Sequence, residues 1–237
     1  MKYSQLRERV CRINQQIGAS GLAQLTWGNA SGIDPNEGVM AIKPSGVDYA
    51  DLTPQDMVLI QVADGAILEG DFKPSSDTAT HLVLYRAFPA ISGIIHTHSR
   101  FATAWAQAHR EIPCFGTTHA DHFFGAVPLT RPLTRAEIEG EYEHNTGLVI
   151  VERFTDNNLD PRHFPGVLVA GHGPFTWGTS VEQAFHNAVA LEEIAAMATA
   201  TVALNPDQTP VADYLLNKHF SRKHGPKAYY GQTPRPQ

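Results

Sequence analysis

Residues 93–100, GIIHTHSR, place two histidines one residue apart at the end of a short apolar run. A run of this length, bounded by a helix signal before it and a polar stretch after it, is typical of a buried strand. Because side chains alternate faces along a strand, His96 and His98 project the same way with Thr97 opposite. The stretch therefore predicts a strand whose end offers two imidazoles to one metal ion.

Helices are predicted on both sides of this strand from apolar periodicity and end signals. The segment before it starts with capping residues and stops at Pro89. The first helix has Gly18 and Gly21 behind it as stop signals. The predicted helices cover residues 6–17, 75–88, 99–110 and 181–204.

The other strands predict how the chain is layered. Residues 56–70 predict a hairpin that turns at Asp64 and Gly65, and residues 38–46 predict a strand before it. Residues 166–178, GVLVAGHGPFTWG, predict one strand that runs into His172. Since helices and strands mix without strict alternation, we predict an α/β fold with a central, mainly antiparallel sheet between helix layers.

Bulk composition limits the class of protein. At 237 residues, with 42% hydrophobic and 18% charged residues, the chain predicts one soluble globular domain over residues 1–237. A net charge of -6 without a basic patch argues against a nucleic-acid partner. The N-terminus lacks a secretory signal and no run approaches a membrane span, so a cytoplasmic protein is predicted.

The histidine pair gains support from two further residues. Cys11 and Cys114 are too few and too far apart for a thiolate site, so metal ligands must be histidines and carboxylates. His172, framed by glycines, follows another apolar run, and Asp77 lies in the first turn of the helix before the histidine strand. Three histidines with an open position are a common catalytic zinc arrangement. The opposing interpretation is that most of the 12 histidines are surface or hydrogen-bonded neutral groups.

Three stretches of small polar residues predict an anion site. They are TWGNAS at 26–31, KPSG at 43–46 and KPSSD at 73–77. Serines at a helix start face unpaired N–H groups and the positive end of the helix dipole, which favour phosphate. Taken singly, each stretch is better explained as a turn and a helix cap. Together they give the candidate substrate-binding residues Gly28, Asn29, Lys43, Ser45, Gly46, Ser75 and Ser76.

Two groups are candidates for moving protons. Asp121 lies in a loop with His119, His122 and aromatic rings, where desolvation is expected to raise its pKa. Tyr229 and Tyr230 lie in a basic tail, where positive charge would make a phenol more acidic. A solvated aspartate and packed tyrosines are the alternatives.

Taken in order, LTWGNAS, IKPSGVDY, KPSSDTATH, GIIHTHSR, GTTHADHFFG, GEYE, AGHGPF and RKHGPKAYYGQ resemble the L-ribulose-5-phosphate 4-epimerases of the class II aldolase superfamily. The resemblance runs from about Leu22 to Gln232. It implies a single α/β domain and a homotetramer with active sites at subunit interfaces. The segment 214–237 is expected to reach a neighbouring subunit's site.

The resemblance also implies roles for the candidate residues. His96, His98 and His172 match the zinc ligands, and Asp77 matches the carboxylate of the metal site; Mn²⁺ is the alternative ion. Asp121 and Tyr230 match the two proton carriers, the tyrosine coming from a neighbour. The phosphate-binding positions are matched by Gly28, Asn29, Ser45, Gly46, Ser75 and Ser76.

The implied reaction interconverts L-ribulose 5-phosphate and D-xylulose 5-phosphate. Carbon 4 has no acidic proton, so inversion requires cleavage of the C3–C4 bond to an enediolate and glycolaldehyde phosphate, followed by addition to the opposite face. The metal acts as a Lewis acid. His219 and Arg222 are weaker candidates for holding the C4 oxygen or the phosphate. Arabinose breakdown and ascorbate-derived xylulose breakdown would both use this reaction.

Two other functions stay open. One is an aldolase that releases its products, resembling the L-fuculose phosphate aldolases, which have glutamate at the position of Asp77. The shorter carboxylate disfavours protonation of the enediolate and so favours its recapture. The other is a non-catalytic interaction module on the same fold, against which the presence of every expected ligand argues.

Overall fold

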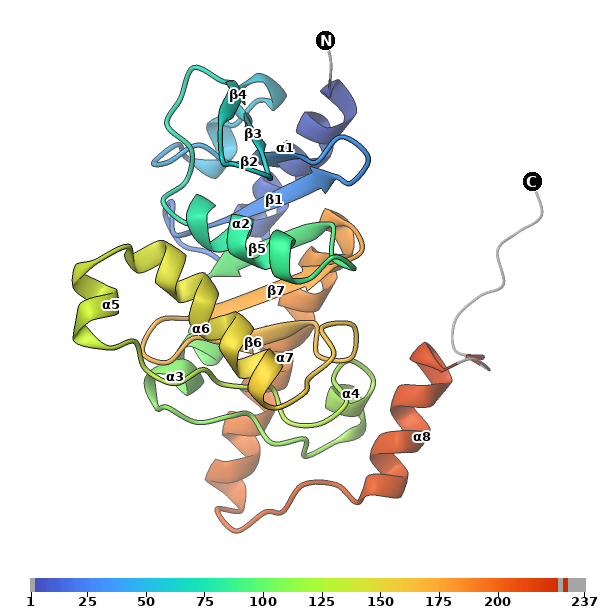
Figure 1. Cartoon of the computed structure of the whole chain (residues 1–237). Coiled ribbons are helices and arrows are strands. Elements are labelled where there is room, and N and C mark those ends of the chain that lie inside the picture. Colours follow the sequence, from blue (N-terminus) through green and yellow to red (C-terminus); the bar gives the residue numbers. More distant parts are fainter. Residues whose placement is uncertain (1–2, 226–227, 230–237) are drawn as a thin grey trace.

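A seven-stranded antiparallel sheet forms the centre of the computed structural model, which describes residues 3–225 and 228–229. The strand order across the sheet is β4-β3-β2-β1-β5-β7-β6, so β1 and β5 lie inside it (Figure 1). The strands are β1 (Gly28–Asp34), β2 (Val39–Ile42), β3 (Val58–Gln61), β4 (Ile67–Glu69), β5 (Gly93–Thr97), β6 (Gly166–Leu168) and β7 (Pro174–Gly178).

Helices cover both faces of this sheet. α1 (Ser4–Ser20) and α7 (Val181–Leu204) pack on one face, and α2 (Thr78–Ala87) and α6 (Tyr142–Asp156) pack on the other (Figure 1). The predicted three-layer α/β fold is therefore confirmed. The other helical elements are α3 (Arg100–Gln107), α4 (Thr117–Ala120), α5 (Arg135–Glu139), α8 (Asp213–His224) and the 3-10 turns η1 (Tyr49–Asp51) and η2 (Pro54–Asp56).

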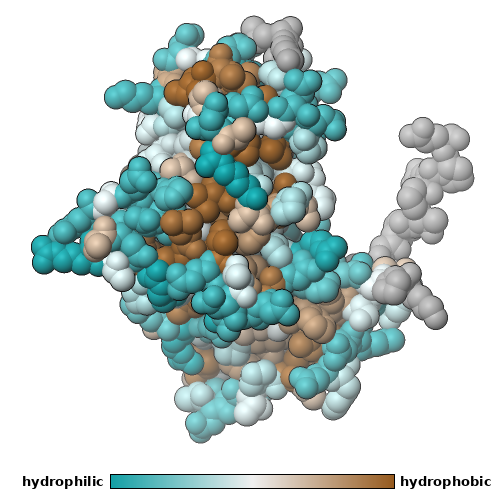
Figure 2. Space-filling view, in the orientation of Figure 1, coloured by the Kyte–Doolittle hydropathy of each residue, from teal (hydrophilic) through white to brown (hydrophobic). Residues whose placement is uncertain are grey.

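Alternating side chains join the strands to the two helix layers. In β2, Val39 and Ala41 pack toward α1 and α7, while Met40 and Ile42 pack toward α2 and α6. This is the period-2 pattern of a strand buried on both faces. In the space-filling view, hydrophobic side chains show through in the middle of the face between α2 and α6, and the projecting α5 region is mostly hydrophilic (Figure 2).

Strand β1 was not predicted, because its residues are small rather than apolar. Asn14 of α1 lies against it: the Ala30 amide donates to Asn14 Oδ1 at 2.8 Å, and Asn14 Nδ2 donates to the Ala30 carbonyl at 3.1 Å. A Cβ added at Gly32 would lie 3.0 Å from Val10 Cγ2. The small residues therefore let α1 approach the centre of the sheet.

Two predicted boundaries were wrong. Residues 166–178 form two antiparallel strands, β6 and β7, and His172 lies in the turn between them rather than at the end of one strand. Gly171 has a φ of +71°, a conformation that suits glycine and makes the tight turn possible. Helix α1 continues through Gly18 and ends at Ser20, with Gly21, the second predicted stop signal, as its C-cap. Glycine at position 18 is explained by packing, because the Tyr49 side chain fills the space that a Cβ would need there.

Helix α7 is long and apolar enough to cross a membrane by length and composition, so the expectation that no run approaches a membrane span was wrong. In the structure it packs against β5, β7, α1 and α3 as a core helix. Its Glu192 carboxylate accepts hydrogen bonds from the backbone amides of Phe101 at 2.8 Å and Ala102 at 3.0 Å. Glu192 thus satisfies the first turn of α3, directly after the histidine strand.

Replacing Glu192 by glutamine is expected to lower the free energy of unfolding by about 1–2 kcal/mol, because a neutral amide replaces a carboxylate at a helix N-terminus. Urea denaturation followed by circular dichroism measures this change. The exposed neighbour Glu193, changed to glutamine, is the matched control and should leave stability within about 0.5 kcal/mol. Equal stabilities for the two variants would show that the capping contact contributes nothing.

Candidate active site

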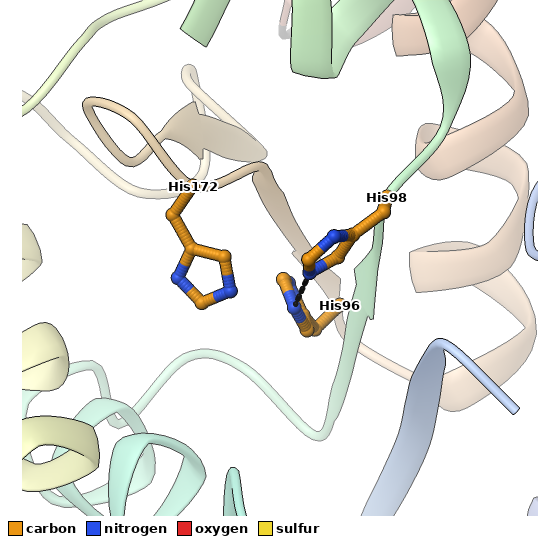
Figure 3. A group of neighbouring side chains, drawn as sticks. All are labelled: His96, His98 and His172. Carbon is orange, nitrogen blue, oxygen red and sulfur yellow. Dashed lines mark hydrogen bonds between the residues drawn. The ribbon is translucent and has the colours of Figure 1, made fainter. Parts of the chain in front are cut away.

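Three histidine side chains converge beside the central strands. His96 belongs to β5, His98 follows its end, and His172 comes from the β6–β7 turn. One ligand nitrogen from each ring lies within 4.8 Å of the other two. Figure 3 shows the three rings gathered at one place, with His98 Nε2 3.1 Å from His96 Nε2.

The chemistry of these rings fits a divalent cation. Burial and the nearby His98 lower the pKa of His96 to about 3, and burial with the neighbouring histidines lowers the pKa of His172 to about 3. Both rings are therefore neutral at pH 7 and can offer a lone pair. His96 Nδ1 lies 3.0 Å from the Pro174 carbonyl, which can only accept, so the proton is on Nδ1 and the lone pair is on Nε2.

Asp77 lies at the entrance to α2 and lines the same cavity as the histidines. Its Oδ2 accepts a hydrogen bond from Asn29 Nδ2 at 2.6 Å, and the same amide donates to Ser75 Oγ at 3.0 Å. Asn29 therefore orients a carboxylate and a serine hydroxyl at once. β1 positions Asn29 opposite His96 of β5 in the sheet register.

The cavity that contains these groups has a volume of about 360 Å³. Every metal-binding and substrate-binding residue predicted from the sequence lines it. They are Gly28, Asn29, Lys43, Ser45, Gly46, Ser75, Ser76, Asp77, His96, His98 and His172. Segments from five separate parts of the chain therefore meet at one site, as the motifs predicted.

A buried lysine makes one side of the cavity suitable for an anion. Lys43 is only 1% exposed, and its ammonium donates to the Pro44 carbonyl at 3.2 Å. Burial lowers its pKa to about 8, although the charge of Asp48 opposes this shift. A desolvated ammonium beside serine hydroxyls and an amide is a strong partner for phosphate.

Tyr49 holds the segment of Trp27 and Gly28, which lines the same cavity as Lys43. Its hydroxyl donates to the Gly28 carbonyl at 2.8 Å and to the Trp27 carbonyl at 3.2 Å. Gly28 has a φ of +103°, and a Cβ there would lie 2.5 Å from the His96 carbonyl oxygen. Glycine is therefore required at this position, since any side chain would push the segment around Gly28 away from the strand that carries His96.

Asp121 lies elsewhere on the chain and does not line the cavity. It is 8% exposed and accepts hydrogen bonds from Arg222 at 2.6 and 3.0 Å and from His219 Nδ1 at 3.0 Å. Burial alone would raise the pKa of Asp121, but these hydrogen bonds and the charge of Lys223 lower it below its usual value. The expectation of a raised pKa was wrong, because α8 returns basic groups to this loop.

The structure describes most, but not all, of the remaining candidate residues. Tyr230 lies outside the described residues, and Tyr229 is 65% exposed. His219 and Arg222 both contact Asp121. Five further residues line the cavity without a role predicted from the sequence, although the GEYE motif was a signal for two of them. These residues are Thr26, Trp27, Pro44, Tyr142 and Glu143.

Comparison with known sequences identifies the family of this chain. The family model of the class II aldolase and adducin N-terminal domain matches residues 8–199. The curated L-ribulose-5-phosphate 4-epimerase UlaF of Salmonella paratyphi C (strain RKS4594) is 52% identical over 227 residues, which cover 96% of this chain and 98% of that protein. The resemblance predicted from the motifs is thereby confirmed.

Solved structures share the fold. An L-fuculose 1-phosphate aldolase matches with a TM-score of 0.78 and 22% identity over 94% of this chain and 97% of its own. The L-fuculose-1-phosphate aldolase of Thermus thermophilus matches with a TM-score of 0.68 and 23% identity over 88% of this chain and 100% of its own. The chain belongs to the class II aldolase and adducin N-terminal domain family.

Proposed function

We propose that this chain is a metal-dependent epimerase that interconverts L-ribulose 5-phosphate and D-xylulose 5-phosphate by inverting carbon 4. The observation that carries the proposal is one cavity that joins three convergent imidazoles to a lysine, serine and amide anion site. The 52% identity to an L-ribulose-5-phosphate 4-epimerase, across nearly the whole of both chains, supports this reaction. The proposed location is the cytoplasm.

The proposed metal is zinc, held by His96, His98 and His172 with Asp77 beside it. Three neutral nitrogen ligands and an adjacent carboxylate suit zinc, and manganese is the second choice. A bound divalent ion supplies Lewis-acid stabilisation of the negative charge that develops on the ketose oxygens. Asn29 keeps the Asp77 carboxylate facing this site through its 2.6 Å hydrogen bond.

The anion site has a separate task during inversion. Lys43, Ser45, Ser75 and the Gly28 loop bind the substrate phosphate in the proposed complex. When the C3–C4 bond breaks, this phosphate stays with the two-carbon aldehyde. The aldehyde can then rotate without leaving the cavity, which presents its opposite face for re-addition.

Asp121 and Tyr230 are the proposed proton carriers. The base takes the proton of the C4 hydroxyl, C4 becomes an aldehyde, and the C3–C4 electron pair passes to the three-carbon enediolate. After re-addition to the other face, the acid on the opposite side protonates the new C4 oxygen. Asp121 is a carboxylate at pH 7 and so is in the form that can accept a proton, while its lowered pKa makes it a weaker base than an ordinary aspartate.

The proposed assembly is a homotetramer in which a neighbouring subunit completes each site. Asp121 is absent from the cavity of its own chain, although it is held firmly by α8. The loop of Asp121 and the segment 214–237 would therefore serve the cavity of an adjacent subunit. This arrangement would bring both proton carriers to the substrate from the same neighbour.

Incubating the purified protein with L-ribulose 5-phosphate tests the function directly. We expect conversion to D-xylulose 5-phosphate, measured by a coupled assay, and loss of that conversion after metal removal with a chelator. Zinc added back should restore it. Free dihydroxyacetone formed at the rate of substrate loss would instead identify an aldolase, and a folded protein with no metal and no turnover would favour an interaction module.

A further inference from the structure

The outer nitrogen of His172 has a side-chain partner. Its Nδ1 lies 3.3 Å from the Tyr142 hydroxyl. Figure 3 shows one ring nitrogen of His172 turned toward His96 and His98 and the other turned away from them. The nitrogen of His172 that faces away from the other two histidines is thus linked to α6.

This link matters because a neutral imidazole has two tautomers. Only the tautomer protonated on Nδ1 leaves a lone pair on Nε2 for a metal. His96 is fixed in this form by the Pro174 carbonyl. Among the described residues, Tyr142 is the hydrogen-bond partner of the His172 ring. The Nδ1–H tautomer of His172 is therefore favoured only if the phenol oxygen acts as the acceptor.

Tyr142 is itself well placed to hold a ring still. It begins α6, and Thr146 Oγ1 donates to its carbonyl at 2.9 Å. The next residue, Glu143, accepts a hydrogen bond on its carbonyl from Thr80 of α2 at 2.5 Å. α6 also packs closely on α2, since a Cβ at Gly147 would lie 2.7 Å from Val83 Cβ. The phenol is therefore carried by a rigid helix pair.

We propose that Tyr142 is a positioning residue for the metal: its phenol oxygen accepts a hydrogen bond from the Nδ1–H group of His172 and so keeps Nε2 available as a ligand. The inference rests on the proposed metal-dependent function but not on the identity of the sugar. Loss of a side chain that hydrogen-bonds to a metal ligand commonly lowers metal affinity by about 10–100-fold.

The test is Tyr142→Phe, which removes one oxygen and keeps the ring. Zinc affinity, measured by competition with a chromophoric chelator, should fall about 10–100-fold. Histidine-labelled, metal-free protein should give nitrogen NMR shifts for an Nδ1–H tautomer of His172 in the wild type, and a shift toward Nε2–H in the variant. Unchanged affinity together with an unchanged tautomer would overturn the proposal.

The matched control is Tyr85→Phe, which removes the same phenol oxygen from a buried tyrosine. Tyr85 bonds to Ser31 at 2.9 Å and does not line the cavity, so zinc affinity should stay at the wild-type value. If Tyr142→Phe does not fold, the wild-type spectrum decides alone: an Nε2–H tautomer at His172 refutes the proposal. Wild-type protein that binds zinc with the Nδ1–H tautomer but leaves L-ribulose 5-phosphate unchanged would support Tyr142 and contradict the epimerase function.

Discussion

His98→Asn is expected to abolish stoichiometric metal binding and to lower the epimerisation rate by at least about 10³-fold. A neutral amide is a poor replacement for an imidazole nitrogen, so the site keeps only two of its three converging rings. Lewis-acid stabilisation contributes several kcal/mol, and each 1.36 kcal/mol is about tenfold in rate. Plasma emission spectrometry gives the metal content, and the coupled assay gives the rate.

His98 is the best of the three ligands for this test, because it is exposed while His96 is buried in the sheet. The substitution should therefore leave the fold and the oligomer intact, which size-exclusion chromatography can check. His186→Asn, at an exposed position of α7, is the matched control and should retain full metal and rate. One zinc per chain in His98→Asn would refute the assigned ligand set.

Asp121→Asn is expected to reduce kcat by about 10²–10⁴-fold while zinc content stays at one per chain. The amide cannot accept the C4 hydroxyl proton, but it can still accept a hydrogen bond from Arg222. Steady-state kinetics separate this loss from a binding defect, since KM should change little. A variant with wild-type kcat would remove Asp121 from the mechanism.

Mixing two inactive variants tests whether each site draws on two subunits. In oligomers reassembled from equal amounts of His98→Asn and Asp121→Asn chains, about a quarter of the sites would combine an intact metal centre with an intact neighbouring aspartate. The mixture should then regain about a quarter of wild-type activity. No recovery in verified mixed oligomers would indicate that both residues act within one chain.

The sequence predicted the elements whose local signals are strong. α7 was predicted from Val181 to Leu204, and the β3–β4 hairpin turns at Gly65 as expected. β1 was missed because the close approach of α1 selects small residues at Ala30 and Gly32 rather than an alternating pattern. This requirement comes from tertiary packing, so no pattern within the strand itself reports it.

All predicted metal-binding and substrate-binding residues line one cavity, and their roles stay predictions. The strand alternation behind His96 and the glycine frame of His172 are local signals for metal binding, and both histidines lie together in the structure. The pKa of Asp121 was predicted in the wrong direction, because Arg222 comes from a helix about 100 residues later. Charges brought together by such distant segments leave no trace in the local sequence.

The most direct test of the central claim is the zinc environment of the purified protein, measured by X-ray absorption at the zinc edge and by anomalous scattering from crystals. We expect one ion per chain with nitrogen ligands at about 2.0–2.1 Å, located by the anomalous signal among His96, His98 and His172. A folded, active epimerase whose ion lies away from these three rings, or that contains no ion, would contradict it.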